Sequence, residues 1–147
     1  MALTLQEMSD RFEIQDLLYD YADMIDLKKF DQLRDVFTED AFIDYSVYGG
    51  VKGNREEIIA FLKEAMTIFP NTHHMNANVQ IKVDGDSATG RVMCFNPQEM
   101  DLGETTHTFM LGLWYVDKYV RTADGWRISE RIEEKCWKFN VPDFMNL

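Results

Sequence analysis

The hydrophobic period of this 147-residue chain changes at Pro70. Before Pro70, apolar residues recur at helical spacing, and after it apolar and polar residues alternate over long stretches, which is typical of β-strands. Four strands are predicted there, with a loop at Asn96–Gly103: Thr72–Val83, Ser87–Phe95, Thr105–Val120 and Gly125–Phe139. Helices followed by a run of strands indicate an α+β fold, in which the helices cover one face of a strongly curved, mostly antiparallel sheet.

Three helices and one strand are predicted before Pro70. Thr4 and Glu7 have the spacing of a capping box and begin a helix that runs to about Leu27. The elements that follow are a short helix, a strand and a third helix, at Phe30–Phe37, at Ala41–Tyr48 and from Asn54 with Glu57 to Pro70. No linker or repeat interrupts residues 1–147, so one domain is expected.

Composition and charge exclude several classes of partner. The formal net charge is −11, and nucleic acids and anionic membrane surfaces both require basic patches. No apolar run reaches the length of a membrane span, and the first residues lack the features of a signal peptide. We therefore expect a cytoplasmic protein. Cys94 and Cys136 lie in strand-like segments without nearby ligands and are interpreted as buried free thiols.

Asp26 lies in an unusual position for a carboxylate. Ile14, Leu18 and Ile25 belong to the apolar stripe of the first helix, and Asp26 lies at the border of this stripe. It is also at the C-terminal end of the helix, where the macrodipole disfavours negative charge. Asp26 therefore either turns to solvent or has a partner that donates a proton or carries positive charge.

His73 and His74 are adjacent at the start of the first strand after Pro70, so at most one of them can enter a pocket. Strand alternation groups His73 with Met75 and Ala77, and His74 with polar residues such as Asn76. A simple apolar core would bury His73, whereas a pocket with polar lining would favour His74. The third histidine, His107, has no neighbours that decide its direction.

No pattern for a nucleotide cofactor or a metal ion is present. The chain lacks a glycine-rich phosphate loop, a nucleophile elbow and clustered Cys or His ligands. Acid-base chemistry remains, because an Asp beside a His orients the imidazole and stabilises its cationic form. Tyrosines such as Tyr21, Tyr45, Tyr48 and Tyr115 are candidates to donate to a developing oxygen anion, or else belong to the core.

An ordered set of short motifs resembles the SnoaL-like superfamily over nearly the whole chain, and within it scytalone dehydratase and hexachlorocyclohexane dehydrochlorinase. The matching residues are Ile14-Gln15-Asp16-Leu17, Asp26, Phe30-Asp31-Gln32-Leu33, Phe37-Thr38-Glu39-Asp40-Ala41, Asp44-Tyr45, Gly53, His74, Asp84-Gly85-Asp86-Ser87-Ala88 and Asp124-Gly125-Trp126-Arg127-Ile128. The resemblance implies a cone-shaped α+β barrel like nuclear transport factor 2, with a pocket between helices and sheet.

Residue by residue, the resemblance implies a catalytic pair of Asp26 and His74, with Tyr45 as a pocket tyrosine. Two positions depart from scytalone dehydratase: Cys94–Gln98 contains no second histidine, and Ile25 replaces a second tyrosine. The expected function is a cofactor-independent, dehydratase-like lyase or isomerase that acts on a small apolar or aromatic molecule. The alternatives are a polyketide-cyclase-like aldol closure and a non-catalytic binding or association module.

Two further expectations concern surfaces. Apolar residues occupy both faces of the strand that contains Met110, Leu111, Leu113 and Trp114, which predicts a homo-oligomer, either a dimer or a trimer. The C-terminal segment Asn140–Leu147 is too apolar for a solvated end, so we expect it to pack over a pocket mouth or a neighbouring subunit.

Overall fold

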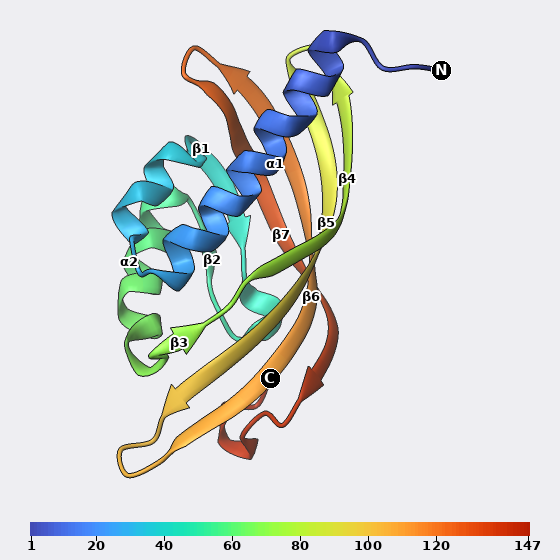
Figure 1. Ribbon diagram of the computed structural model, residues 1–147. Helices are drawn as coiled ribbons and strands as arrows, with labels where there is room; N and C mark the ends of the chain where they lie inside the picture. Colours follow the sequence, from blue (N-terminus) through green and yellow to red (C-terminus); the bar gives the residue numbers. More distant parts are fainter.

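A computed structural model describes residues 1–147 and contains two α-helices and seven strands. The elements are α1 (Leu5–Asp26), β1 (Phe37–Asp44), β2 (Lys52–Gly53), α2 (Arg55–Ala65), β3 (Asn71–Thr72), β4 (Met75–Asp84), β5 (Ser87–Asp101), β6 (Thr106–Thr122) and β7 (Gly125–Phe139). The long strands β4 to β7 form a curved sheet, and α1 and α2 lie on its concave side (Figure 1).

The strand order is β2-β1-β7-β6-β5-β3, and β4 also pairs with β5. Every pairing is antiparallel except that of β1 with β7, which is parallel. The predicted α+β class with a curved, mostly antiparallel sheet is therefore confirmed. The sheet does not close on itself, and the helices cover its open side.

The predicted helix at Phe30–Phe37 differs from the structure. Residues Phe30–Asp35 form a 3₁₀ helix, and the strand predicted at Ala41–Tyr48 begins earlier, at Phe37. Phe30, Leu33 and Val36 are buried at a spacing of three residues, which matches the three residues per turn of a 3₁₀ helix. The chain thus has two α-helices where three helices were predicted.

The strand predicted at Ser87–Phe95 is also longer than expected. β5 continues through most of the predicted Asn96–Gly103 loop to Asp101, because β6 pairs with it along its whole length. These long strands extend below the helices in Figure 1 and carry the lower rim of the site described below.

Helix α1 is anchored near its N-terminal end. The predicted capping box of Thr4 and Glu7 is present at its start. Near that end, the Asp10 carboxylate accepts hydrogen bonds from both terminal nitrogens of Arg121 in β6, at 2.8 and 2.9 Å. These bonds, chiefly, hold the pKa of Asp10 at about 2. At the other end of α1, the Asp26 carboxylate bonds to Thr72 and His74, which follow α2 in the chain.

The two cysteines differ in exposure. Cys94 is buried as predicted, but Cys136 is exposed, so the interpretation of both as buried thiols was wrong for Cys136. Cys136 lies near the end of β7, where the six residues from Glu134 to Phe139 are all exposed.

Neither α-helix combines the length and the apolar character that a membrane span requires.

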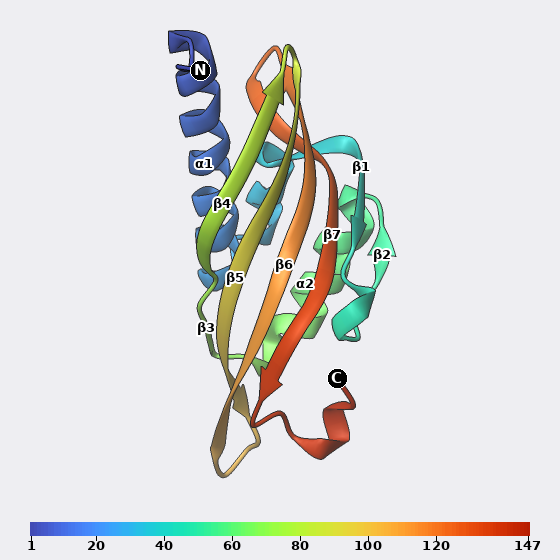
Figure 2. The same cartoon turned by 90° about the vertical axis from the view of Figure 1, so that its right-hand side faces the viewer.

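The C-terminal segment folds back onto the protein, as one of the two predicted arrangements requires. After β7 the chain turns toward the side that carries α2 and β2 and forms a short 3₁₀ helix, Asp143–Met145 (Figure 2). Met145 and Leu147 line the main cavity, and Val141 packs against the core. The segment therefore covers part of the mouth of this cavity.

Candidate active site

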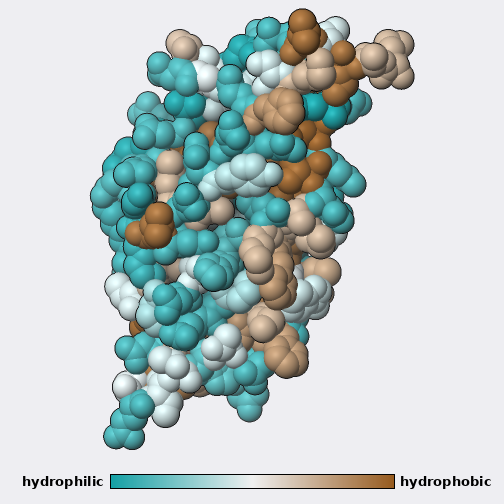
Figure 3. Space-filling view, in the orientation of Figure 1, coloured by the Kyte–Doolittle hydropathy of each residue, from teal (hydrophilic) through white to brown (hydrophobic).

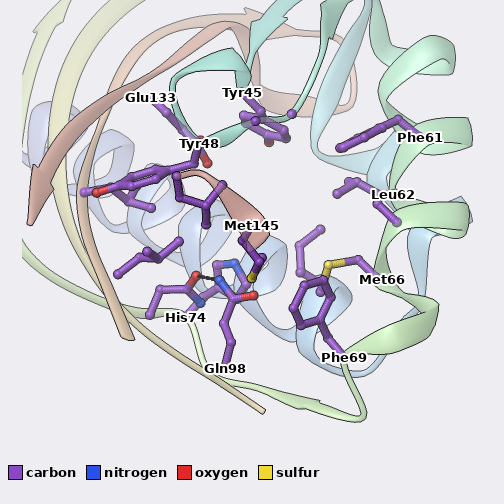
Figure 4. Close-up of a pocket in the computed structure, with 18 of the residues that line it drawn as sticks. Tyr45, Tyr48, Phe61, Leu62, Met66, Phe69, His74, Gln98, Glu133 and Met145 are labelled. Atoms are coloured by element: carbon purple, nitrogen blue, oxygen red, sulfur yellow. Dashed lines mark hydrogen bonds between the residues drawn. The ribbon is translucent and has the colours of Figure 1, made fainter. Parts of the chain in front are cut away.

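A cavity of about 410 Å³ lies between the helices and the concave face of the sheet. Of its 22 lining residues, 16 are hydrophobic. Phe61, Leu62, Met66 and Phe69 form one wall, and Figure 4 shows them opposite the sheet. The polar lining is sparse, and its labelled members are Tyr45, Tyr48, His74, Gln98 and Glu133. Such a lining suits an apolar molecule that is oriented by a few polar groups.

Asp26 and His74 form a hydrogen-bonded pair at this cavity. The Asp26 Oδ1 atom lies 2.6 Å from His74 Nδ1, and Asp26 Oδ2 accepts from the His74 backbone N–H at 2.9 Å. The Thr72 hydroxyl donates to the same Oδ1 at 2.8 Å. The side chains of His74 and Asp26 are 10% and 19% exposed. Asp26 therefore has donating partners, which is the second of the two arrangements considered for it.

The environment of Asp26 fixes which ring nitrogen of His74 carries the proton that faces it. Burial raises the pKa of this carboxyl, but the hydrogen bond from the His74 ring and the electrostatic attraction of that ring, together with the hydrogen bonds from the His74 backbone and Thr72, outweigh burial and leave the pKa below its usual value. Asp26 is thus a carboxylate at neutral pH and can only accept. His74 must donate from Nδ1, which leaves Nε2 of the neutral ring with a free lone pair.

A β-bulge decides which of the two adjacent histidines enters the site. Asn78 has a left-handed backbone with φ of 46°, and the pairing of β4 with β5 shifts between Ala77 and Gln80. Before the bulge, Thr72, His74 and Asn76 face inward, and after it Val79 and Ile81 do so. His73 is exposed and is held through its backbone, whose N–H donates to the Pro97 carbonyl at 3.0 Å.

Tyr45 lies at the cavity, as the resemblance implied. Its hydroxyl is 2.7 Å from the hydroxyl of Tyr21, and both side chains are buried and line the cavity. Burial raises the pKa of Tyr21 to about 12 and that of Tyr45 well above its usual value. Both phenols are therefore neutral at neutral pH, and the pair can pass a hydrogen bond to a bound molecule.

Sequence reasoning missed two ionisable residues on the inner face of β7, Arg131 and Glu133. Arg131 is fully buried and forms a two-bond ion pair with Asp117, at 2.8 and 2.7 Å. Its guanidinium also lies over the rings of Tyr21 and Tyr115, at 4.3 and 4.0 Å from their centres. Glu133, two residues further along β7, lines the cavity.

Of three further polar residues, His107 lies away from the cavity, whereas Asn96 and Gln98 line it. His107 is not among the lining residues, and its Nε2 atom is 2.7 Å from the Asn140 carbonyl oxygen. Asn96 and Gln98 do line the cavity and bond to each other at 2.5 Å, while Asn96 Nδ2 donates to the His73 carbonyl. No group of three or more His, Cys, Asp or Glu side chains has a geometry that could hold a metal ion.

A curved open sheet, with helices across its concave face, a cavity between them and a hydrogen-bonded Asp-His pair at that cavity, defines the α+β class of nuclear transport factor 2. The chain belongs to the SnoaL-like family, whose domain model matches residues 6–132. It is 47% identical to the uncharacterized protein Rv2910c of Mycobacterium tuberculosis over 136 residues, which cover 92% of each chain.

Two solved structures illustrate the shared fold. A Novosphingobium aromaticivorans protein, provisionally named a scytalone dehydratase, matches with a TM-score of 0.84 and 20% identity, over 95% of this chain and 93% of that one. A hexachlorocyclohexane dehydrochlorinase, LinA type 2, matches with a TM-score of 0.82 and 18% identity, over 95% of this chain and 93% of that one.

Proposed function

We propose that this chain is a cofactor-independent lyase or isomerase that removes a proton from a small, apolar, ring-containing molecule. The observation that carries the proposal is the 2.6 Å contact of Asp26 Oδ1 with His74 Nδ1, which leaves His74 Nε2 free beside an apolar cavity. The dehydratase and dehydrochlorinase named among the similar structures both catalyse eliminations according to their names, which supports the same reaction class.

Each polar group has one role in this reaction. His74 Nε2 takes a proton from a carbon next to a carbonyl, and the Asp26 carboxylate orients the ring and stabilises the imidazolium that forms. Tyr45, whose hydroxyl bonds to Tyr21 at 2.7 Å, donates to the carbonyl oxygen as negative charge develops there. The apolar walls exclude water and so strengthen these interactions.

The test is proton exchange at a carbon acid of the expected kind. Purified protein is incubated with 1-tetralone in D₂O, and deuterium at C2 is followed by mass spectrometry. We expect exchange above the buffer rate with the wild-type protein and none above it with His74→Ala. The matched control is His73→Ala, because His73 is adjacent but exposed, and it should retain the wild-type rate. Equal rates in His74→Ala and wild-type protein would refute the proposal.

We also propose that the protein forms a homo-oligomer through the outer face of the sheet. Figure 3 shows that the face crossed by α1 is mostly hydrophilic, with apolar atoms gathered toward the side of the long strands. Phe95 and Trp137 contact each other at 5.7 Å between ring centres, and Phe139 is 62% exposed. Exposed aromatic residues on a sheet face favour burial against another subunit.

A further inference from the structure

Glu133 is the only acidic residue among those that line the cavity. It pairs in register with Tyr115 of β6, and both residues line the cavity. Figure 4 shows the Glu133 side chain extending from β7 into the cavity beside Tyr48, while His74 lies on a different side of it, near Gln98. A bound molecule in the cavity thus has His74 on one side and Glu133 on another.

No hydrogen bond or ion pair holds the Glu133 carboxyl in place. The nearby cation, Arg131, forms its two-bond ion pair with Asp117 instead. Burial raises the pKa of Glu133 to about 8; Arg131 opposes this rise, and Asp44 of β1 adds to it. Further ionisable groups near Glu133 are Tyr21, Tyr45, Tyr48, Tyr115 and Cys94, and burial raises the pKa of each of them. The Nζ atom of Lys135 lies 5.2 Å from the centre of the Tyr48 ring. Glu133 therefore carries a proton at neutral pH.

Packing alone does not explain this carboxyl. A polar group without a partner in an apolar site lowers stability, and buried acids with a raised pKa concentrate at functional sites. An elimination that expels hydroxide needs a proton at the departing oxygen, and an imidazole that has just accepted a proton on another wall of the cavity is not placed to supply it. Glu133 has both the proton and the position.

We infer that Glu133 is the proton donor of this site and that the substrate carries a hydroxyl group β to its carbonyl; this inference rests on the proposed function. His74 Nε2 takes the proton at the α carbon, and the electron pair of that C–H bond forms the new C=C bond. The C–O bond at the β carbon breaks, and the departing oxygen takes the Glu133 proton and leaves as water. Transfer of the proton from His74 to Glu133 through water restores both groups, so the net products are the alkene and one water molecule.

The test compares two leaving groups on one ring system. 3-Hydroxy-1-tetralone needs a proton on its leaving oxygen, whereas 3-acetoxy-1-tetralone loses acetate without one; both give 1-naphthol, which is followed by fluorescence. We expect Glu133→Gln to slow turnover of the hydroxy ketone by about 100-fold or more and to leave turnover of the acetate within a few-fold of wild type. The matched control is Glu134→Gln, because exposed Glu134 follows directly and bonds to Arg91, and it should change neither rate.

The outcomes separate this inference from the proposed function. If Glu133→Gln slows both substrates equally, or slows neither, while His74→Ala abolishes both activities, Glu133 is not the proton donor and the proposed function stands. If the wild-type protein turns over neither substrate, the elimination and the role of Glu133 both fail.

Carbon-13 NMR of carboxyl-labelled glutamate gives a readout that does not depend on turnover. We expect one resonance that titrates above pH 7 and is missing in Glu133→Gln. A Glu133 resonance that is already that of a carboxylate at pH 6 overturns the inference.

Discussion

At the scale of single residues, the site combines a predicted pair with an acid that the sequence did not reveal. Asp26 and His74 were predictable because helix geometry placed Asp26 at an unfavourable helix end and the family resemblance marked His74. The inward direction of Glu133 could not be predicted, because it depends on a bulge in β7. Ser129 is the extra residue of this bulge and lies opposite the junction of Lys118 and Tyr119. Strict alternation from Trp126 and Ile128 would have turned Glu133 outward, whereas the bulge turns it inward.

Glu133 should make stability depend on pH in a specific direction. Between the usual glutamate pKa and the folded value of about 8, the unfolded chain has released the Glu133 proton and the folded protein has not. The free energy of unfolding therefore falls as pH rises through this window. Glu133→Gln should be more stable than wild type by up to about 4 kcal/mol at pH 8, with the difference vanishing near pH 4.

Urea unfolding at both pH values checks this expectation. Glu134→Gln serves as the control and should show no pH-dependent gain. A Glu133→Gln variant that is less stable than wild type at pH 8 would show that the carboxyl is ionised and has a stabilising partner.

At the scale of elements, the bulge in β4 places the proposed base. The sequence predicted a continuous strand at Thr72–Val83 whose apolar residues face inward. This is correct only after Asn78, because before Asn78 the polar residues His74 and Asn76 face inward. Alternation alone could not show this, because the change of face depends on one residue with φ of 46°. The helix predicted at Phe30–Phe37 is present as a 3₁₀ helix at Phe30–Asp35, since a spacing of three residues also fits this tighter helix.

The bulge makes a prediction of its own. Asn78→Gly should keep the left-handed backbone and the wild-type activity, because glycine adopts this conformation readily. Asn78→Val should lower the unfolding free energy by about 1 to 3 kcal/mol, because a β-branched residue is strained there. It should also reduce deuterium exchange at 1-tetralone, since relief of the strain would re-aim His74. Thermal unfolding measures the loss of stability, and the exchange assay measures the loss of activity. Full activity in Asn78→Val would show that the bulge does not determine the direction of His74.

At the scale of the whole molecule, the outer sheet face is expected to be an interface. Apolar residues lie on both faces of β6, as predicted. Leu111 and Leu113 are buried under the helices, while Met110 and Trp114, on the other face, are only half-buried. We expect light scattering at micromolar concentration to give the mass of a dimer or trimer. Phe139→Lys should shift the mass toward that of the monomer, while Phe12→Lys, a change at a similarly exposed phenylalanine on α1, should not. A monomeric wild-type protein would contradict this expectation.

The central claim is that Asp26 and His74 act as one unit, and a double-mutant cycle on the deuterium exchange of 1-tetralone tests it most directly. Asp26→Asn keeps the shape of the side chain but removes the charge that orients the ring, so it should slow exchange by about 100-fold or more, as should His74→Ala. Asp23→Asn, one turn earlier and exposed, is the control and should retain the wild-type rate. The double variant should be no slower than His74→Ala alone, because Asp26 acts only through His74. Losses that multiply in the double variant, or an Asp26→Asn protein with the wild-type rate, would contradict the account.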